Sequence, residues 1–212
     1  MPRGGFITIE GGEGAGKSTH SRRLAETLRA RGLDVVRTRE PGGAPGAEGI
    51  RDLLLGHHGY DWEPVTEALL HFAARREHLS KTVMPALERG DWVVSDRFAD
   101  STMAYQGYGL GLGHEVIEEL YALSIGDFRP DVTIILDLAA EEGMARARAR
   151  GEDLDRYEAM DLEFHRRLRQ GFLDIAERDP DRCVVVDATA AVEDVGTAIL
   201  AAVESRLTVP SP

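Results

Sequence analysis

The sequence predicts an α/β fold, a three-layer sandwich in which helices cover both faces of a five-stranded, mostly parallel sheet. Short apolar runs of β-type residues alternate with longer amphipathic segments along the chain, and this alternation is typical of βαβ units. The apolar runs are nearly continuous, as expected for parallel strands that are buried on both faces. The length of 212 residues fits a single domain over residues 1–212.

Strands and helices are expected in turn from the first residues onward. The expected strands are Phe6–Ile9, Val35–Val36, Trp92–Val94, Val132–Leu136 and Val184–Val186. The expected helices run from about Lys17 to Arg31, around Ile50–Leu54, from about Pro64 to Arg89, around Val116–Leu123, from about Tyr157 to Ala176 and from Val192 to Leu207. Each helical segment is amphipathic, so that its apolar side can pack on the sheet.

The charge balance excludes several classes of protein. The net charge is −12, and only two of the 25 basic residues are lysines, Lys17 and Lys81. A general nucleic-acid coat needs a basic surface, so we expect no nucleic acid as a partner. The single cysteine, Cys183, excludes an intramolecular disulfide and a cysteine-rich zinc site. No membrane span and no secretory apolar region are visible, so we expect a cytoplasmic protein.

Residues 11–18 fit the phosphate-binding pattern G-x-x-x-x-G-K-[ST]. Its glycines let backbone N–H groups surround phosphate oxygens, and the following helix adds the positive end of its dipole. Lys17 would reach the β- and γ-phosphates, and Ser18 would ligate Mg²⁺. The alternative is a glycine-rich turn with an incidental lysine, but the pattern follows an expected strand and opens an expected helix. The expected triphosphate-binding residues are Gly11, Gly12, Glu13, Gly14, Ala15, Gly16, Lys17, Ser18 and Thr19.

The absence of asparagine narrows the class of P-loop protein. A GTPase would need an Asn-Lys-x-Asp motif to read guanine, and the chain contains no asparagine. A motor or DNA-translocating ATPase usually has a larger body and a basic track, which do not fit 212 residues with a net charge of −12. A small phosphotransferase with the P-loop NTPase fold remains.

Asp96 and Arg97 follow the expected strand Trp92–Val94. Ligands of an open parallel sheet lie outside the carboxyl ends of the strands, so both side chains would emerge beside the phosphate-binding loop. Asp96 would then hold Mg²⁺, and Arg97 would clamp a transferring phosphoryl group. The alternative is an aspartate that caps the next turn and an arginine at the surface.

Three further candidates are ambiguous from the sequence alone. Glu40 lies in a turn after the second strand and could face the metal, although a plain Pro-Gly turn also explains this stretch. Arg51 could be a solvated residue of an amphipathic helix. In the helix around Leu69–His78, an aromatic residue and arginines could bind a base, whereas a core phenylalanine with exterior arginines is the alternative.

In combination, these motifs resemble thymidylate kinase, the bacterial family that phosphorylates dTMP with ATP, and the resemblance covers essentially the whole chain. The most specific markers are Arg-Glu-Pro-Gly-Gly at 39–43, Asp-Arg-Phe at 96–98 and Ala-Tyr-Gln-Gly at 104–107, in this order. Other markers are the segment 6–18, Ala-Arg-x-x-His at 74–78 and Val-Asp-Ala-Thr at 186–189.

The resemblance implies a role for each residue that matches the family's motifs. Glu13 would contact the sugar 3′-hydroxyl, Arg51 and Arg97 would hold the dTMP phosphate, and Arg75 would read the thymine edge. Gln106 would lie by the base and Tyr105 near the sugar. The expected dTMP-binding residues are Glu13, Glu40, Arg51, His71, Phe72, Arg75, Arg97, Ser101, Tyr105 and Gln106. His71 precedes Arg75 by four residues and Phe72 precedes Arg76 by four, so that either His71 or Phe72 would stack on thymine.

The resemblance also implies a small lid over about residues 143–157. Ala15 stands in the loop where some members carry a basic residue, which is similar to the subtype that supplies its catalytic arginine from the lid. The expected catalytic residues are Lys17, Arg97, Arg146 and Arg150. Arg146 and Arg150 share a helix face, whereas Arg148 points elsewhere. Asp187 and Ala188 would lie near adenine.

The implied activity is transfer of the γ-phosphoryl group of ATP to dTMP, giving dTDP and ADP in dTTP biosynthesis. ATP would be bound with Mg²⁺, held by Ser18 and Asp96, and the chain would form a homodimer. Two other hypotheses stay open at this point: a kinase for another nucleotide or small metabolite, and a non-catalytic module that senses nucleotides.

Overall fold

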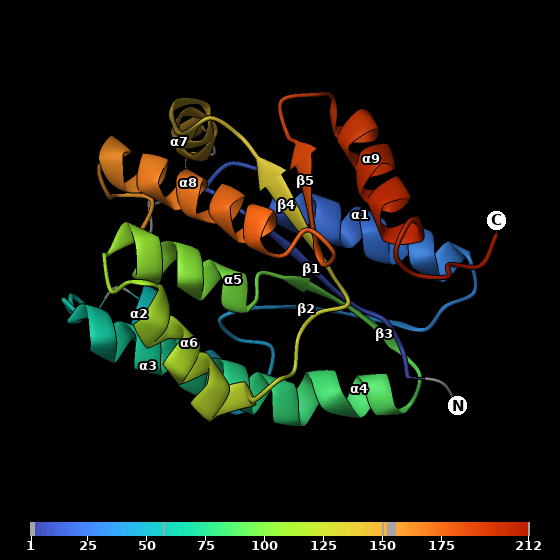
Figure 1. The fold of residues 1–212 in the computed structure, drawn as a ribbon, viewed down its shortest axis with the longest axis horizontal. Helices are drawn as coiled ribbons and strands as arrows, with labels where there is room; N and C mark the ends of the chain where they lie inside the picture. Colours follow the sequence, from blue (N-terminus) through green and yellow to red (C-terminus); the bar gives the residue numbers. More distant parts are fainter. Residues whose placement is uncertain (1–2, 57, 150, 152–155, 212) are drawn as a thin grey trace.

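The computed structural model describes residues 3–56, 58–149, 151 and 156–211. In this part of the chain, five strands form one sheet in the order β2-β3-β1-β4-β5, and every neighbouring pair is parallel. Helices lie on both sides of the sheet (Figure 1). The expected three-layer α/β fold with a parallel five-stranded sheet is confirmed.

Each strand extends beyond the apolar run that predicted it. The strands are β1 (Phe6–Gly11), β2 (Val35–Arg39), β3 (Trp92–Asp96), β4 (Val132–Asp137) and β5 (Cys183–Asp187). β1 lies at the centre and is buried along its whole length. The added residues include polar ones at the carboxyl ends, and the parallel register sets Arg39 of β2 beside Asp96 of β3.

Two hydrophobic cores hold the helices on the sheet. On one face, α1 (Lys17–Ala30) and α9 (Val192–Glu204) pack against the central strands. The core on the other face includes side chains from α3 (Pro64–His78), α5 (Ala99–Thr102), α6 (His114–Ile125) and α8 (Leu162–Arg178). Outside these layers, α2 (Pro45–Leu55) packs on α3, and α7 (Ala140–Ala149) packs on α8.

The expected helix from Pro64 to Arg89 is one helical run with a change in winding. α3 is followed by a π-helical segment, η1 (Leu79–Val83), and then by α4 (Met84–Glu88). Pro85 has no N–H to donate to the Lys81 carbonyl group, and its ring would collide with that group in an α-helix. The wider winding of η1 directly before Pro85 accommodates the ring.

Residues 99–109 are helical, which the sequence analysis did not anticipate. α5 continues into a second π-helical segment, η2 (Met103–Gly109). Its glycines favour a loop in the sequence, but here they permit close packing, since a Cβ on Gly109 would lie 2.5 Å from Cε2 of Phe164 in α8. Packing on α8 therefore overrides the local preference of these residues for a loop.

The carboxyl ends of β1, β2 and β3 lie next to one another because these strands are adjacent and parallel. The chain segments that leave these ends are the phosphate-binding loop, the turn with Glu40 and the turn with Arg97. Among the described helices, none combines the length and the apolar composition that a membrane crossing requires.

Candidate active site

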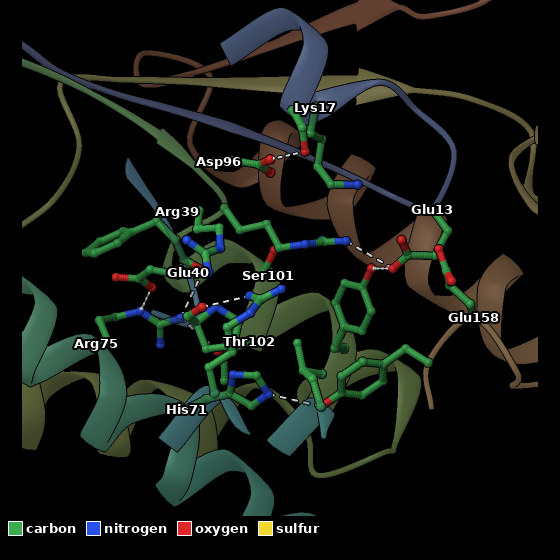
Figure 2. Close-up of a pocket in the computed structure, with 18 of the residues that line it drawn as sticks. Glu13, Lys17, Arg39, Glu40, His71, Arg75, Asp96, Ser101, Thr102 and Glu158 are labelled. Carbon is green, nitrogen blue, oxygen red and sulfur yellow. Dashed lines mark hydrogen bonds and ion pairs between the residues drawn. The ribbon is translucent and has the colours of Figure 1, made fainter. Parts of the chain in front are cut away.

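A cavity of about 550 Å³ opens at the carboxyl ends of β1, β2 and β3, which is within the usual size of a ligand-binding pocket. Figure 2 shows Lys17 and Asp96 at one end of it and His71 and Arg75 at the other. Most candidate residues line this cavity: Glu13, Gly14, Gly16, Lys17, Ser18, Thr19, Glu40, Arg51, His71, Arg75, Asp96, Arg97, Ser101, Tyr105 and Gln106. Residues up to 93 positions apart in the sequence, from Glu13 to Gln106, are thus brought together.

The phosphate-binding loop begins at the end of β1 and ends at α1. Gly11, Gly14 and Gly16 all have positive φ angles, a backbone conformation that only glycine adopts readily. Nζ of Lys17 donates to the carbonyl oxygen of Gly12 at 2.6 Å. Burial and the nearby charge of Arg97 lower the pKa of Lys17 to about 8.

Ser18 and Asp96 meet across the ends of β1 and β3. The hydroxyl of Ser18 donates to Oδ2 of Asp96 at 2.5 Å. A hydroxyl and a carboxylate oxygen are hard ligands of the kind that Mg²⁺ prefers, and Mg²⁺ usually takes few protein ligands together with substrate phosphates. The described residues include no group of three or more His, Cys, Asp and Glu side chains that could enclose a metal.

Arg97 lines the cavity and has contacts on several sides. Its guanidinium group donates to Oε1 of Glu13 at 3.0 Å and to Ser101 Oγ at 3.2 Å, and it lies 4.9 Å from the ring centroid of Tyr105. Tyr105 also hydrogen-bonds to Glu13. Burial alone would raise the pKa of Glu13, but the charges of Arg97 and Lys17 hold it at about 2. The negative charge of Glu13 and the positive charge of Arg97 therefore compensate each other.

The backbone of Arg97 has a φ of +71°, a left-handed conformation that is uncommon for residues other than glycine. Two contacts hold it there: its N–H donates to the carbonyl oxygen of Ile9, and Glu10 accepts from the N–H of the next residue, Phe98, at 2.7 Å. Glu10 also accepts from Ser101 at 2.5 Å. Burial and the charge of Asp100 raise the pKa of Glu10 to about 8.

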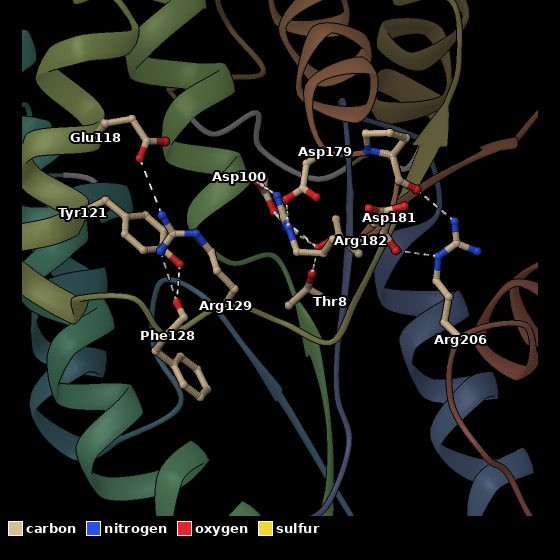
Figure 3. Close-up of polar contacts among 12 residues, drawn as sticks. Thr8, Asp100, Glu118, Tyr121, Phe128, Arg129, Asp179, Asp181, Arg182 and Arg206 are labelled. Atoms are coloured by element: carbon tan, nitrogen blue, oxygen red, sulfur yellow. Dashed lines mark hydrogen bonds and ion pairs between the residues drawn. The ribbon is translucent and has the colours of Figure 1, made fainter.

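A polar network behind the cavity anchors α5 to the sheet (Figure 3). Nη1 of Arg182 donates to Asp100 at 2.6 Å and to Thr133 at 2.7 Å, and its Nε donates to Asp179 at 2.7 Å. Helix α5, which carries Ser101, is therefore attached to β4 and to the residues before β5.

Arg75 on α3 is buried and oriented by several partners. Its Nε donates to Glu40 at 2.7 Å, and its Nη2 donates to the Phe98 carbonyl oxygen and to Thr102, each at 3.0 Å. Glu40 is also 2.8 Å from Nδ1 of His78. Glu40 thus faces Arg75 and His78 in this structure, while Nη1 of Arg75 is buried without a hydrogen-bond partner among the described residues.

His71 and Phe72 occupy different environments. His71 lines the cavity, and its Nε2 lies 3.0 Å from the hydroxyl of Tyr157. Phe72 does not line the cavity; its side chain is 1% exposed and packs in the core near Tyr121. Arg51 lines the cavity and donates to the carbonyl oxygen of Pro41 at 2.8 Å.

Three candidates for the adenine and lid contacts do not line this cavity: Arg146, Asp187 and Ala188. Nη1 of Arg146 on α7 donates to the carbonyl oxygen of Ala188 at 3.1 Å, and its Nη2 donates to Glu142 at 2.6 Å. Asp187 is exposed and accepts from Thr189. Three residues of the phosphate-binding loop do not line the cavity: Gly11, Gly12 and Ala15. Arg150 lies outside the described residues.

α7 packs directly on the phosphate-binding loop. A Cβ on Gly143 would lie 2.4 Å from the carbonyl oxygen of Glu13, and one on Gly14 would lie 2.2 Å from the carbonyl oxygen of Gly143. Only glycine permits this close approach of the two backbones. The helix at the start of the expected lid segment is therefore in contact with the loop that would hold phosphate.

The sequence analysis missed several residues at this site. Arg39, Thr102, Tyr157 and Glu158 line the cavity, and Glu10 and Glu67 are buried beside it. A signal existed for Glu67, because residues 67, 71 and 75 recur at four-residue spacing and share a helix face. Glu10, a carboxylate at the end of an apolar strand, was a second signal.

Comparisons with known proteins point to one family. The family model described as thymidylate kinase matches residues 9–199. A thymidylate kinase from Caulobacter vibrioides is 54% identical over 207 residues, which cover 98% of this chain and 99% of the relative. One from Alkalilimnicola ehrlichii is 52% identical over 208 residues, 98% of this chain and 96% of the relative. The crystal structure of thymidylate kinase from Ehrlichia chaffeensis aligns with a TM-score of 0.78 and 38% identity, covering 96% of this chain and 99% of that chain.

Proposed function

The chain belongs to the thymidylate kinase family. From this premise we propose that it transfers the γ-phosphoryl group of ATP to dTMP, giving dTDP and ADP. The reaction would take place in the cavity described above. The observation that carries the proposal is that one cavity joins both kinds of group that this reaction needs. Lys17, which would bind phosphate, lies at one end, and His71, which would face the base, lies at the other. Arg97 and Gln106 line the same cavity.

The proposed chemistry asks for little covalent work from the protein. The acceptor oxygen of a 5′-phosphate is already anionic and needs no strong general base. Catalysis then depends on aligning the two substrates and on neutralising the charge of the transferring group. Lys17 would neutralise the β- and γ-phosphates, and Arg97 and Arg51 would hold the dTMP phosphate.

The remaining roles are proposed on the same basis. Mg²⁺ would neutralise phosphate charge, and Ser18 and Asp96 would hold it. Asp187 and Ala188 would lie near adenine, and Arg146 is supported as their neighbour by its contact with Ala188. Residues of about 143–157 would form the lid that excludes water from the transfer. Arg146 would act there together with Arg150.

His71 and Gln106 would face thymine, with Arg75 at the edge of the base, Tyr105 and Glu13 at the sugar and Ser101 beside the phosphate site. Support comes from the positions of these residues in the cavity wall. His71 is preferred over Phe72 for contact with the base because Phe72 is enclosed by the core.

The proposed function is tested by ADP release with ATP, Mg²⁺ and one acceptor at a time: dTMP, dUMP, dGMP, AMP or CMP. We expect dTMP to stimulate ADP release far more than the purine nucleotides or CMP do. If dTMP gave no stimulation above background while another acceptor did, the chain would be a kinase for that acceptor. If none of them stimulated release, the hypothesis of a nucleotide-sensing module would gain support instead.

We also propose that the chain works in the cytoplasm as a homodimer. Apolar side chains on three neighbouring helices are exposed, with Leu53 on α2, Val65 and Leu69 on α3, and Leu123 on α6, which is 84% exposed. A second copy packed on these helices would bury them. Sedimentation of the full chain should give twice the mass of 23.2 kDa, and a concentration-independent monomer would refute the dimer.

A further inference from the structure

A buried carboxylate, Glu67 on α3, lies behind the wall of the cavity that would face the base. The residue is fully buried. Its Oε1 accepts from Nε2 of Gln106 and from the hydroxyl of Tyr157, each at 2.7 Å. Its Oε2 lies 2.8 Å from Nη1 of Arg156. One side chain thereby joins α3, η2 and the residues that precede α8.

These contacts fix the direction in which the amide of Gln106 faces. Because Nε2 of Gln106 donates to Oε1 of Glu67, the amide nitrogen of Gln106 faces the carboxyl group. The same nitrogen also lies 3.2 Å from the hydroxyl oxygen of Tyr157. The amide oxygen is then turned away from Glu67, and it is buried with no hydrogen-bond partner in the described ranges. The wall therefore presents an unused acceptor at Gln106.

The same carboxylate fixes the tautomer of His71 through Tyr157. Because the hydroxyl of Tyr157 gives its one proton to Glu67, its oxygen must accept the hydrogen bond from Nε2 of His71. His71 therefore carries its proton on Nε2 and leaves Nδ1 as an acceptor. Burial and the charge of Arg75 lower the pKa of His71 to about 3, so the imidazole stays neutral.

Arg75 supplies a donor beside these acceptors, since its Nη1 is buried and unpartnered among the residues that the structure describes. A donor next to an acceptor complements the imide edge of thymine, in which O4 accepts and N3–H donates. The corresponding edge of cytosine has the opposite polarity, with a donating amino group and an accepting N3. Leaving such buried groups mismatched is the usual way in which a site rejects an analogue.

We propose that Glu67 is a positioning residue that makes the site selective for an imide base, because it holds Gln106 with its oxygen toward the base. The proposal rests on the proposed dTMP kinase activity and adds the residue that determines the class of base. Glu67 acts through Gln106 and Tyr157 and does not contact the base itself.

The test replaces the carboxylate with an amide that can donate. In Glu67→Gln, the new NH₂ group competes for the same partners, so that Gln106 can turn its own nitrogen toward the base. We expect the preference for dTMP over dCMP, measured as the ratio of their kcat/KM values, to decrease at least about tenfold. The KM for ATP should be unchanged. Glu77→Gln on the same helix makes the same change in charge outside the cavity and should leave the ratio unaltered.

A double-mutant cycle separates this role from a merely structural one. In a Gln106→Leu background there is no amide to orient, so Glu67→Gln should then change the ratio little. An unaltered ratio in the single variant, or additive effects in the cycle, would overturn the proposal. If Glu67→Gln does not fold, Gln106→Leu alone removes the amide that Glu67 orients, and an unaltered ratio there would overturn the proposal equally. Failure of the unmodified chain to phosphorylate dTMP would instead refute the proposed function.

Discussion

Replacing Lys17 by alanine is expected to lower kcat for dTMP-dependent ADP formation by at least about 10²-fold, the scale of losing one donor to transition-state charge. Lys17 is buried at the first turn of α1, and its Nζ is held against the loop by the carbonyl oxygen of Gly12. A methyl group cannot replace the positive charge at this point. The measurement is the initial rate of ADP formation at saturating ATP and dTMP.

The chain provides a matched control, because Lys81 is its other lysine. Lys81 lies exposed on η1, away from the cavity. Lys81→Ala should therefore keep the rate of the unmodified enzyme. Unchanged dTMP-dependent turnover in Lys17→Ala would refute the role of the loop.

Titration should reproduce part of this loss. The pKa of Lys17 is lowered to about 8 by burial and by Arg97, so the free enzyme loses this charge as the pH rises above 8. Because Lys17 loses one proton, we expect kcat/KM for ATP to fall by up to about tenfold per pH unit above pH 8. Lys17→Arg keeps the charge at these pH values, and the decline should be absent or begin at higher pH.

Replacing Arg97 by alanine is expected to lower kcat by about 10³-fold, the lower end of the range for an arginine that stabilises a transferring phosphoryl group. Burial alone would lower the pKa of Arg97, but Tyr105 and Glu13 raise it above its ordinary value, so the charge is permanent. The substitution also removes the ion-pair partner of Glu13, whose pKa should rise from about 2. Single-turnover rates with dTMP measure the loss directly.

Two further variants define what Arg97 contributes. Arg97→Lys retains the charge without the planar fork, and its rate should fall between those of the unmodified enzyme and Arg97→Ala. Arg22→Ala removes an exposed arginine from α1 outside the cavity and should have no effect. Equal rates in Arg97→Ala and Arg22→Ala would exclude Arg97 from the reaction.

The phosphate end of the site was predictable because its residues follow local rules. The spacing of residues 11–18 encodes the loop without reference to the rest of the chain. Asp96 and Arg97 could be placed because the carboxyl ends of adjacent parallel strands share one edge of the sheet. Both rules use only the order of strands and turns, which the apolar runs reveal.

The base end depended on contacts that no local rule encodes. Glu67 and Tyr157 are 90 residues apart and meet only because α3 and the residues before α8 pack around η2. The choice between His71 and Phe72 depends on the rotation of α3 about its axis, which is set by the packing of α3 in one of the two cores. Residues 103–109 were not recognised as helical because their glycines favour a loop until α8 packs against them.

The two ends of the cavity are attached to different parts of the scaffold. Asp96 ends β3, Arg97 follows it, and Lys17 opens α1 after the loop that leaves β1. His71 and Gln106 belong instead to α3 and η2. Substitutions at separate positions with no shared partner tend to have independent effects. A fold arranged in this way can exchange one nucleobase preference for another during evolution while its transfer chemistry is preserved, and a designer would vary the two helices and leave the sheet untouched.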